Sequence, residues 1–158
     1  MEPWPDPVER VAAALRTAGV DAQIEELAAG TATAAAAAKA VGCELSQIVK
    51  TLVFSCDNSF VLAMVPGDRK ADEQRVAAAA KAGSARIAKA DEVRAATGFE
   101  PGGVAPVPAA DGSRALIDRA LLLHEVVWIG AGSSQHVAGL APADLARAAR
   151  AEPADLSA

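Results

Sequence analysis

The chain has 158 residues, a formal net charge of −5 and a hydrophobic content of 52%, whereas aromatic residues make up only 3%. A chain of this length can bury a sizeable core, and we expect one domain over residues 1–158. The acidic balance argues against a broad DNA-binding surface, and no stretch approaches the roughly 20 apolar residues that a membrane span needs.

The N-terminus and the cysteines indicate where the protein works. Glu2, Asp6 and Glu9 lie where a secretory signal would carry a long apolar run, so such a signal is not predicted. Cys43 and Cys56 form no evident disulfide framework. We therefore expect a cytoplasmic protein with reduced thiols that binds neither DNA nor a membrane.

The first half of the chain combines helical and strand patterns. Val8, Val11 and Leu15 have helical spacing, and Asp6 is the expected cap of that helix. The pattern predicts, in chain order, a helix over about 6–18, a short strand over 21–26, an alanine-rich helix capped by Thr31 or Thr33 and ending at Gly42, and strands over 48–55 and 60–65. The last two strands are apolar on both faces and separated by a short polar segment, so we expect a central hairpin.

The second half continues the mixture without regular alternation. It predicts a helix over 72–82, a short strand over 84–88, a helix from about Asp91 to Gly98, a loop rich in Pro and Gly through Pro108, strands over 115–117, 126–129 and 136–140, and a last helix over 142–150. Residues 121–123 remain of uncertain type. This order predicts an α+β fold with a mixed or antiparallel sheet.

Lys50 and a later glycine-rich loop are the main candidate site. In a strand, Lys50 shares a face with Leu52 and Phe54, so its ammonium must reach water, find a counter-charge or lose proton affinity. The loop over 98–106 contains Gly102 and Gly103, whose small size lets backbone amides approach a ligand. A cation and bare amides would suit a polarised carbonyl or a phosphate. Each feature alone could also be structural, as a strand-end lysine or a tight turn.

Other polar residues are weaker candidates. Ser133 and His136 lie at a glycine-rich turn and are candidates for lining a binding pocket, although a histidine serves as readily in a core. Ser133 has no identifiable triad, so a hydrolase would use water or the substrate as nucleophile. Asp118 ends a predicted strand and is either a substrate-binding residue or a structural cap. Because the scattered His and Cys residues form no ligand cluster, we predict no metal and no cofactor.

Four segments, in this order, resemble the YbaK family, the free-standing form of the editing domain associated with prolyl-tRNA synthetase. They are Gln47–Phe54, Val65–Arg69, Thr97–Pro106, and Ile117–Asp118 followed by Leu121. The resemblance implies an α+β fold with a mixed, partly barrel-like sheet flanked by helices. It also implies hydrolysis of the ester that joins a wrong amino acid to the tRNA acceptor end, with an aminoacyl-tRNA synthetase as a possible partner.

The resemblance also assigns roles to residues. Lys50 would help to hold the aminoacyl end, and the amides of the loop from Gly102 to Pro106 would face the scissile carbonyl. Gly102 and Gly103 are thus candidate catalytic residues with Lys50, and Val104, Ala105 and Pro106 would contact substrate. Preorganised amides stabilise the negative charge that develops on the carbonyl oxygen during ester hydrolysis.

Departures from the family pattern bear on the substrate. Ala105 replaces a serine of many relatives, so a hydroxyl contact is lost there. Leu27 and Val137 occupy the positions of a tyrosine and an aspartate that matter in the cysteine-editing branch, and Leu27 would contact the substrate instead. We therefore expect alanine or serine as the edited amino acid. We also expect a pocket nearly free of aromatic side chains, with aliphatic surroundings from Ile24, Leu27, Val49 and Val104. The alternative is a non-catalytic module that binds an aminoacyl-tRNA or nucleotide end.

Overall fold

The structure is a computed structural model and describes residues 4–27, 33–108 and 114–158. Its larger sheet contains, in spatial order, β4 (Ala85–Ile87), β2 (Val49–Cys56), β3 (Ser59–Pro66), β5 (Arg114–Asp118) and β8 (Ala151–Ala154). The smaller sheet contains β1 (Gln23–Glu26), β7 (His136–Leu140) and β6 (Val127–Gly130) in that order. Strand β3 is antiparallel to β2 but parallel to β5, so the larger sheet is mixed and the predicted α+β class is confirmed.

The hairpin of β2 and β3 forms the middle of the larger sheet. Only Asp57 and Asn58 separate the two strands, and the register runs from Cys56↔Ser59 to Val49↔Pro66. Asp57 has a φ of 55°, a conformation that Asp and Asn tolerate better than most residues. The prediction of a central hairpin is confirmed, because β4 flanks β2 and β5 flanks β3.

Strand β2 also connects the two sheets. At its start, Ile48 forms a parallel bridge with Trp128 of β6, whereas β4 pairs only with the far end of β2, over Phe54 to Cys56. The sheets therefore meet along one edge of β2, which gives the partly closed arrangement that the resemblance implied. Between the two contacts, the edge of β2 that faces away from β3 has no strand partner in the described part of the chain.

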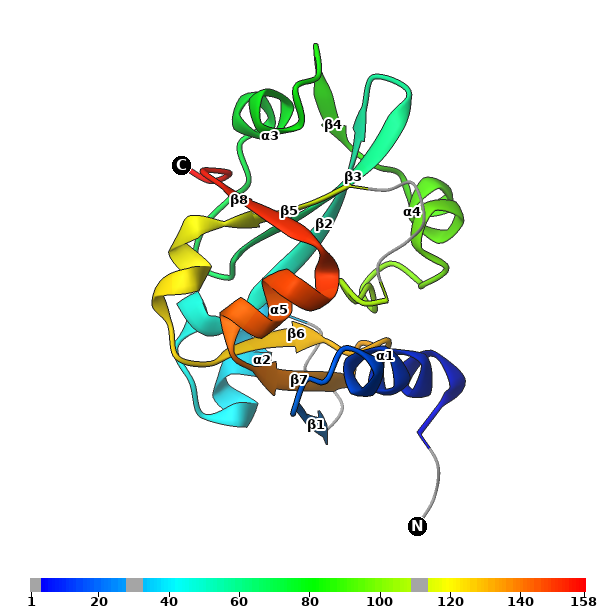
Figure 1. The fold of residues 1–158 in the computed structure, drawn as a ribbon, viewed down its shortest axis with the longest axis vertical. Helices are drawn as coiled ribbons and strands as arrows, with labels where there is room; N and C mark the ends of the chain where they lie inside the picture. Colours follow the sequence, from blue (N-terminus) through cyan, green and yellow to red (C-terminus); the bar gives the residue numbers. More distant parts are fainter. Residues whose placement is uncertain (1–3, 28–32, 109–113) are drawn as a thin grey trace.

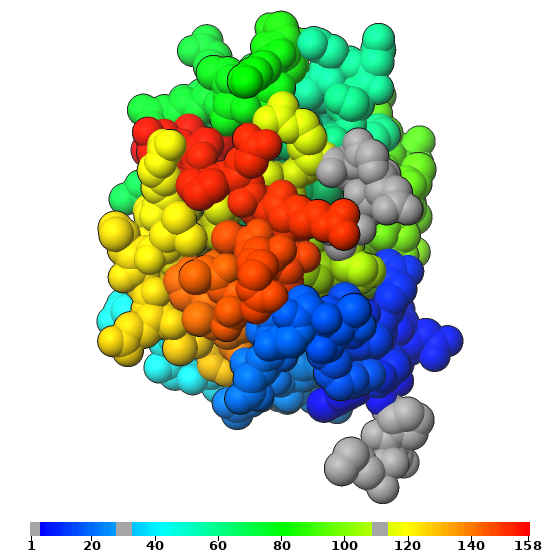
Figure 2. Space-filling model, in the orientation of Figure 1, coloured from blue at the N-terminus to red at the C-terminus, as the bar shows by residue number. Residues whose placement is uncertain are grey.

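Helices flank the sheets on several sides. They are α1 (Asp6–Thr17), α2 (Ala34–Val41), α3 (Glu73–Ala80), α4 (Ala90–Thr97) and α5 (Pro142–Ala149), with short 3₁₀ helices at Leu45–Gln47 and Arg119–Leu123. Helices α1 and α3 lie at opposite ends of the molecule (Figure 1). Helices α1 and α5 lie side by side on the face shown in Figure 2. There the Arg147 guanidinium donates to the carbonyl oxygen of Ala18 at 2.6 Å.

Aliphatic side chains from both sheets and both of these helices share one core cluster. It includes Leu15 of α1, Met64 of β3, Ile129 of β6 and Leu145 of α5, all at most 2% exposed. Burial of a side chain of this size stabilises the fold by roughly 1.5–3 kcal/mol. The core therefore holds β2, β6 and β7 rigidly around the space between the sheets.

Several local predictions need correction. Asp6 is the first residue of α1 rather than its cap, since the cap position is Pro5 and no side chain caps the helix. Thr33 caps α2 by accepting from the Ala36 amide, while Thr31 lies outside the described residues. Strand β8 was not predicted, because Pro153 and its polar neighbour Glu152 do not give a strand pattern. Residues 121–123 belong to a 3₁₀ helix.

Candidate functional site

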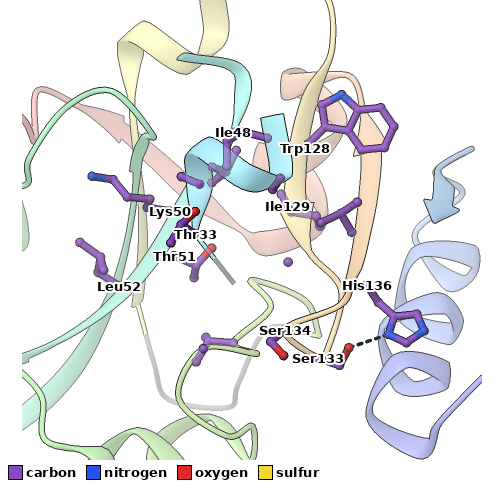
Figure 3. A pocket seen from close by; sticks show the side chains of 17 residues that line it. Thr33, Ile48, Lys50, Thr51, Leu52, Trp128, Ile129, Ser133, Ser134 and His136 are labelled. Carbon is purple, nitrogen blue, oxygen red and sulfur yellow. Dashed lines mark hydrogen bonds between the residues drawn. The ribbon is translucent and has the colours of Figure 1, made fainter. Parts of the chain in front are cut away.

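A cavity of about 340 Å³ lies between the two sheets at the unpaired edge of β2 (Figure 3). Its wall comes from the start of α2, the first half of β2, the glycine-rich loop, β6 and the turn into β7. The lining residues are Thr33, Ala34, Ala37, Ile48, Val49, Lys50, Thr51, Leu52, Gly102, Val104, Trp128, Ile129, Gly130, Ser133, Ser134, His136 and Val137. Among the described residues, this lining contains no carboxylate, and apolar and neutral polar groups dominate it. A volume of this size suits the end of a larger ligand.

Lys50 lies on the β2 side of the cavity. Its side chain extends away from Ser133 and His136, which lie on the opposite side (Figure 3). The ammonium donates a hydrogen bond to the Arg69 carbonyl oxygen. Burial lowers the pKa of the Lys50 ammonium and Lys70 lowers it further, while nearby Asp68 opposes the shift. The structure thus places a partly desolvated cation at one end of the cavity, where an anionic group would bind it more strongly than in water.

The glycine-rich loop forms the wall across from β2. Gly102 has a φ of 87°, a conformation that suits glycine. The Gly103 amide already donates to the Glu100 carbonyl oxygen at 2.9 Å. In contrast, the amides of Gly102, Val104 and Ala105 donate no hydrogen bond within the described residues. Gly102 and Val104 line the cavity and Ala105 follows them in the loop, so these amides are candidate donors to a ligand.

Gly103 has a different role in the loop. A Cβ atom there would lie 3.1 Å from the Ser133 Cα atom and 3.3 Å from the Gly132 carbonyl oxygen. The loop backbone therefore packs directly on the turn between β6 and β7, and only glycine fits without displacement. This close approach sets the position of the free amides relative to Ser133.

Ser133 and His136 interact on the far side of the cavity. The Ser133 Oγ atom lies 2.5 Å from His136 Nδ1 and accepts from the Gln135 amide at 3.1 Å. His136 is 5% exposed and meets the Trp4 ring edge to face at 5.5 Å. Its Nε2 atom has no hydrogen-bond partner in the described residues, although the Glu26 carboxylate lies 3.9 Å away. The turn thus holds the imidazole in place, as packing and hydrogen bonds around a ring nitrogen do.

The remaining predicted site residues lie outside the cavity lining. Leu27 is buried and packs with Ala37, Ile48 and Val137, which do line it, so Leu27 supports the wall from behind. The side chain of Ala105 is 2% exposed in the main core, and Pro106 is also buried.

Asp118 is engaged in the fold rather than in the cavity. Its buried carboxylate accepts from the amides of Ala120 and Leu156 and, at 2.6 Å, from the Ser157 hydroxyl. These contacts fasten the C-terminal segment to the end of β5, which favours the structural reading of Asp118.

Sequence reasoning missed Thr51, Thr33 and Trp128 as cavity residues. The expectation of surroundings nearly free of aromatic side chains is wrong, since Trp128 lines the cavity and packs over Gly139. Ile24, expected near the pocket, lines a different depression beside α1. No local sequence pattern indicated that Trp128 lies at the cavity, because β6 comes next to β2 through the long-range bridge between Ile48 and Trp128.

Residues 4–27, 33–108 and 114–158 contain no group of three or more His, Cys, Asp or Glu side chains placed to hold a metal ion. Among the helices of these ranges, none has the length and apolar character of a membrane span.

Known proteins resemble this chain in sequence and in fold. Residues 28–148 match the family model described as the aminoacyl-tRNA editing domain. A proline–tRNA ligase of Xanthomonas oryzae pv. oryzae is 31% identical over 137 residues, which cover 84% of the chain and 24% of the ligase. One from Lactobacillus gasseri is 32% identical over 92 residues, which cover 58% of the chain and 16% of the ligase. The chain thus spans about a quarter or less of the length of these relatives.

A solved structure resembles the whole chain. It is described as a candidate trans-editing enzyme for prolyl-tRNA synthetase, and it superposes with a TM-score of 0.91 at 35% identity. The superposition covers 99% of both chains.

Proposed function

Because the chain belongs to the aminoacyl-tRNA editing domain family, we propose that it is a trans-editing enzyme that removes alanine or serine from a mischarged tRNA. Membership makes the chain a deacylase whose substrate class is aminoacyl-tRNA. The amino acid, the tRNA and the roles of individual residues are our proposal. The observation that carries it is that Lys50 and loop residues with free amides, Gly102 and Val104, line the same cavity.

The reaction is hydrolysis of the ester at the 3′ end of the tRNA. The oxygen of water attacks the carbonyl carbon, the bond from that carbon to the ribose oxygen breaks, and the ribose oxygen takes up a proton from the water. If the neighbouring ribose hydroxyl attacks first, the ester moves to that hydroxyl and water then hydrolyses it in the same way. The products are the free amino acid and a tRNA with its terminal hydroxyl restored. Negative charge develops on the carbonyl oxygen, and the amides of Gly102, Val104 and Ala105 are preorganised to stabilise it.

Lys50 orients the substrate. Its ammonium lies at the end of the cavity away from Ser133, and the exposed cations Arg69 and Lys70 follow β3 beside it. A phosphate or ribose oxygen of the terminal nucleotide placed there would leave the aminoacyl group pointing into the cavity. This local cationic group also explains how an acidic protein holds the end of an RNA.

The walls of the cavity favour a small amino acid. Trp128, Ile129 and Val137 occupy space that a bulky side chain would need. Apolar walls discriminate by only about 1–3 kcal/mol per methylene, so overlap among small residues is expected. Leu27 and Val137 offer no polar group to a thiol, which argues against cysteine as the main substrate.

The tRNA follows from the relatives. Two matched proteins are proline–tRNA ligases and the matched structure is described in relation to prolyl-tRNA synthetase. We therefore take the tRNA that this synthetase charges as the substrate, with the synthetase itself as a candidate partner.

Single-turnover deacylation tests the proposal. Proline-accepting tRNA charged with alanine, serine, cysteine, phenylalanine or proline would be mixed with excess protein, and the remaining ester would be followed with time. We expect alanyl and seryl esters to be hydrolysed well above the background rate and the other three much more slowly. Tight binding of all five esters without hydrolysis would instead support the non-catalytic module. Equal rates on phenylalanyl and alanyl esters would contradict a size-selective cavity.

A further inference from the structure

Thr51 is the residue next to Lys50, and the strand register turns its backbone toward the cavity. A two-residue hairpin loop makes Cys56 and Ser59 a hydrogen-bonded pair, so residues 50, 52 and 54 also bond to β3. The backbone amides and carbonyls of the odd-numbered residues of β2 then point away from β3. The hydrogen bond from the Ala88 amide to the Val53 carbonyl oxygen confirms this direction. The amide and carbonyl of Thr51 therefore lie on the edge of β2 that is unpaired between β4 and β6.

The hydroxyl of Thr51 makes no hydrogen bond with the described residues of the fold. Within the described residues, two buried side-chain polar atoms lack a hydrogen-bond partner, the Thr51 Oγ1 atom and the His136 Nε2 atom. Both residues line the same cavity. A buried polar group without a partner is costly, so each such atom calls for an explanation, and a bound ligand that supplies the partner is one. The Glu26 carboxylate lies near the His136 Nε2 atom. No hydrogen-bonding neighbour of the Thr51 hydroxyl is found among the described residues.

The other polar groups of the cavity would each bind a different part of the substrate. In the proposed function, the free amides of the loop bind the ester carbonyl and Lys50 binds the nucleotide. The described residues of the lining include no carboxylate for the α-ammonium group, so a backbone carbonyl on the free edge of β2, such as that of Thr51, is the acceptor that they offer. Thr33 caps α2, Ser133 contacts His136 and Ser134 is exposed, so the buried hydroxyl of Thr51 is the one that remains for the amino acid side chain. A rotation of about 120° around the Cα–Cβ bond moves this hydroxyl between staggered positions without moving the strand.

We propose that Thr51 determines specificity by forming a hydrogen bond with the side-chain hydroxyl of a seryl ester. This inference rests on the proposed function and goes beyond it, because it makes serine a selected substrate rather than one tolerated for its size. A valine at this position has nearly the same shape and lacks the hydroxyl, so the variant separates polarity from volume. A serine keeps the hydroxyl and serves as the matched control.

The test compares seryl and alanyl esters on one tRNA. Single-turnover rates would be measured for the wild type, Thr51→Val and Thr51→Ser, each normalised to folded protein. We expect Thr51→Val to lower kcat/KM on the seryl ester by roughly 3- to 12-fold, the range that corresponds to one neutral hydrogen bond. Its kcat/KM on the alanyl ester should stay within about twofold, and Thr51→Ser should keep the preference of the wild type.

A thermal melt adds a readout that does not depend on substrate. Because the hydroxyl is buried without a partner, Thr51→Val should melt at the same or a higher temperature than the wild type. A lower melting temperature would show that the hydroxyl is used inside the fold, and it would overturn the proposal. Equal losses on both esters would mean that Thr51 holds a group common to them, and no loss on either would mean that it holds nothing.

Failure of the wider function looks different. If the wild type hydrolyses neither ester, the proposed function is wrong. If it hydrolyses the alanyl ester alone, the function stands and the role of Thr51 in selecting serine does not.

Discussion

The close approach of Gly103 to the neighbouring turn makes the substitution Gly103→Ala informative. The added Cβ would lie 3.1 Å from the Ser133 Cα atom and 3.3 Å from the Gly132 carbonyl oxygen, and both are backbone atoms. The turn has little room to retreat, since a Cβ on Gly132 would itself lie 2.6 Å from the Pro7 carbonyl oxygen. The loop must therefore move away from the turn instead.

The expected size of the effect follows from this geometry. Overpacking of this kind costs about 1–3 kcal/mol of the free energy of unfolding, and each kcal/mol lowers the melting temperature of a domain of this size by about 2–4 °C. The displaced loop carries the free amides of Val104 and Ala105. Because misplacement of a catalytic group by about 1 Å can cost 10²-fold, we expect a fall in the single-turnover rate on this order.

The control is a second glycine with a similar cost and no contact with the cavity. Gly19 follows α1 with a φ of 71°, and nothing lies within 4 Å of its added Cβ atom. Gly19→Ala should lose roughly 1–3 kcal/mol through backbone strain while keeping its rate per folded molecule. The reasoning would be refuted if Gly103→Ala kept a near-wild-type rate per folded molecule, or if Gly19→Ala lost as much activity.

Three further predictions use other parts of the structure. Lys50→Met should abolish most of the deacylation without lowering the melting temperature, because burial lowers the pKa of Lys50 and so disfavours its charged form in the fold. The control is Lys81→Met, which removes an exposed cation outside the cavity lining. An active Lys50→Met protein would exclude this role of Lys50. If the ammonium is needed, wild-type activity above the background of Lys50→Met should decline as pH rises through the lowered pKa. Asp118→Ala should lose about 2–4 kcal/mol of stability, since it leaves the Ala120 amide and two donors of the C-terminal segment unpaired. If the single-turnover rate per folded molecule were also lost, Asp118 would belong to the site. Finally, the Arg86 guanidinium holds the pKa of Glu92 at about 2, below the usual 4.5. The stabilising effect of this ion pair is thus present above pH 4.5 and lost as pH falls toward 2. In Glu92→Gln, the melting temperature should therefore depend less on pH in that window than in the wild type. An unchanged dependence would argue against the ion pair.

Much of the fold was determined by local sequence patterns. The alternation and apolar character of residues 48–65 predicted the hairpin, and Thr33 and Gly42 marked the ends of α2. These signals are strong because strand burial, helix capping and left-handed glycine conformations depend on neighbouring residues. The ordered motifs around Lys50 and Gly102 were enough to indicate the family, which the comparisons confirmed.

The composition of the cavity was decided by tertiary structure. Residues 51 and 128 are far apart in the chain and meet only because Ile48 bridges to Trp128 at one end of β2 while β4 pairs with the other. No local pattern states that an edge of a central strand stays unpaired over its middle, so Thr51 looked like an ordinary strand residue. In the same way, the sequence alone could not show that the Gly103 amide is used in a turn and that its missing side chain admits the backbone of Ser133. Long-range pairing and close backbone contacts depend on where separate segments meet, and this information is absent from any single segment.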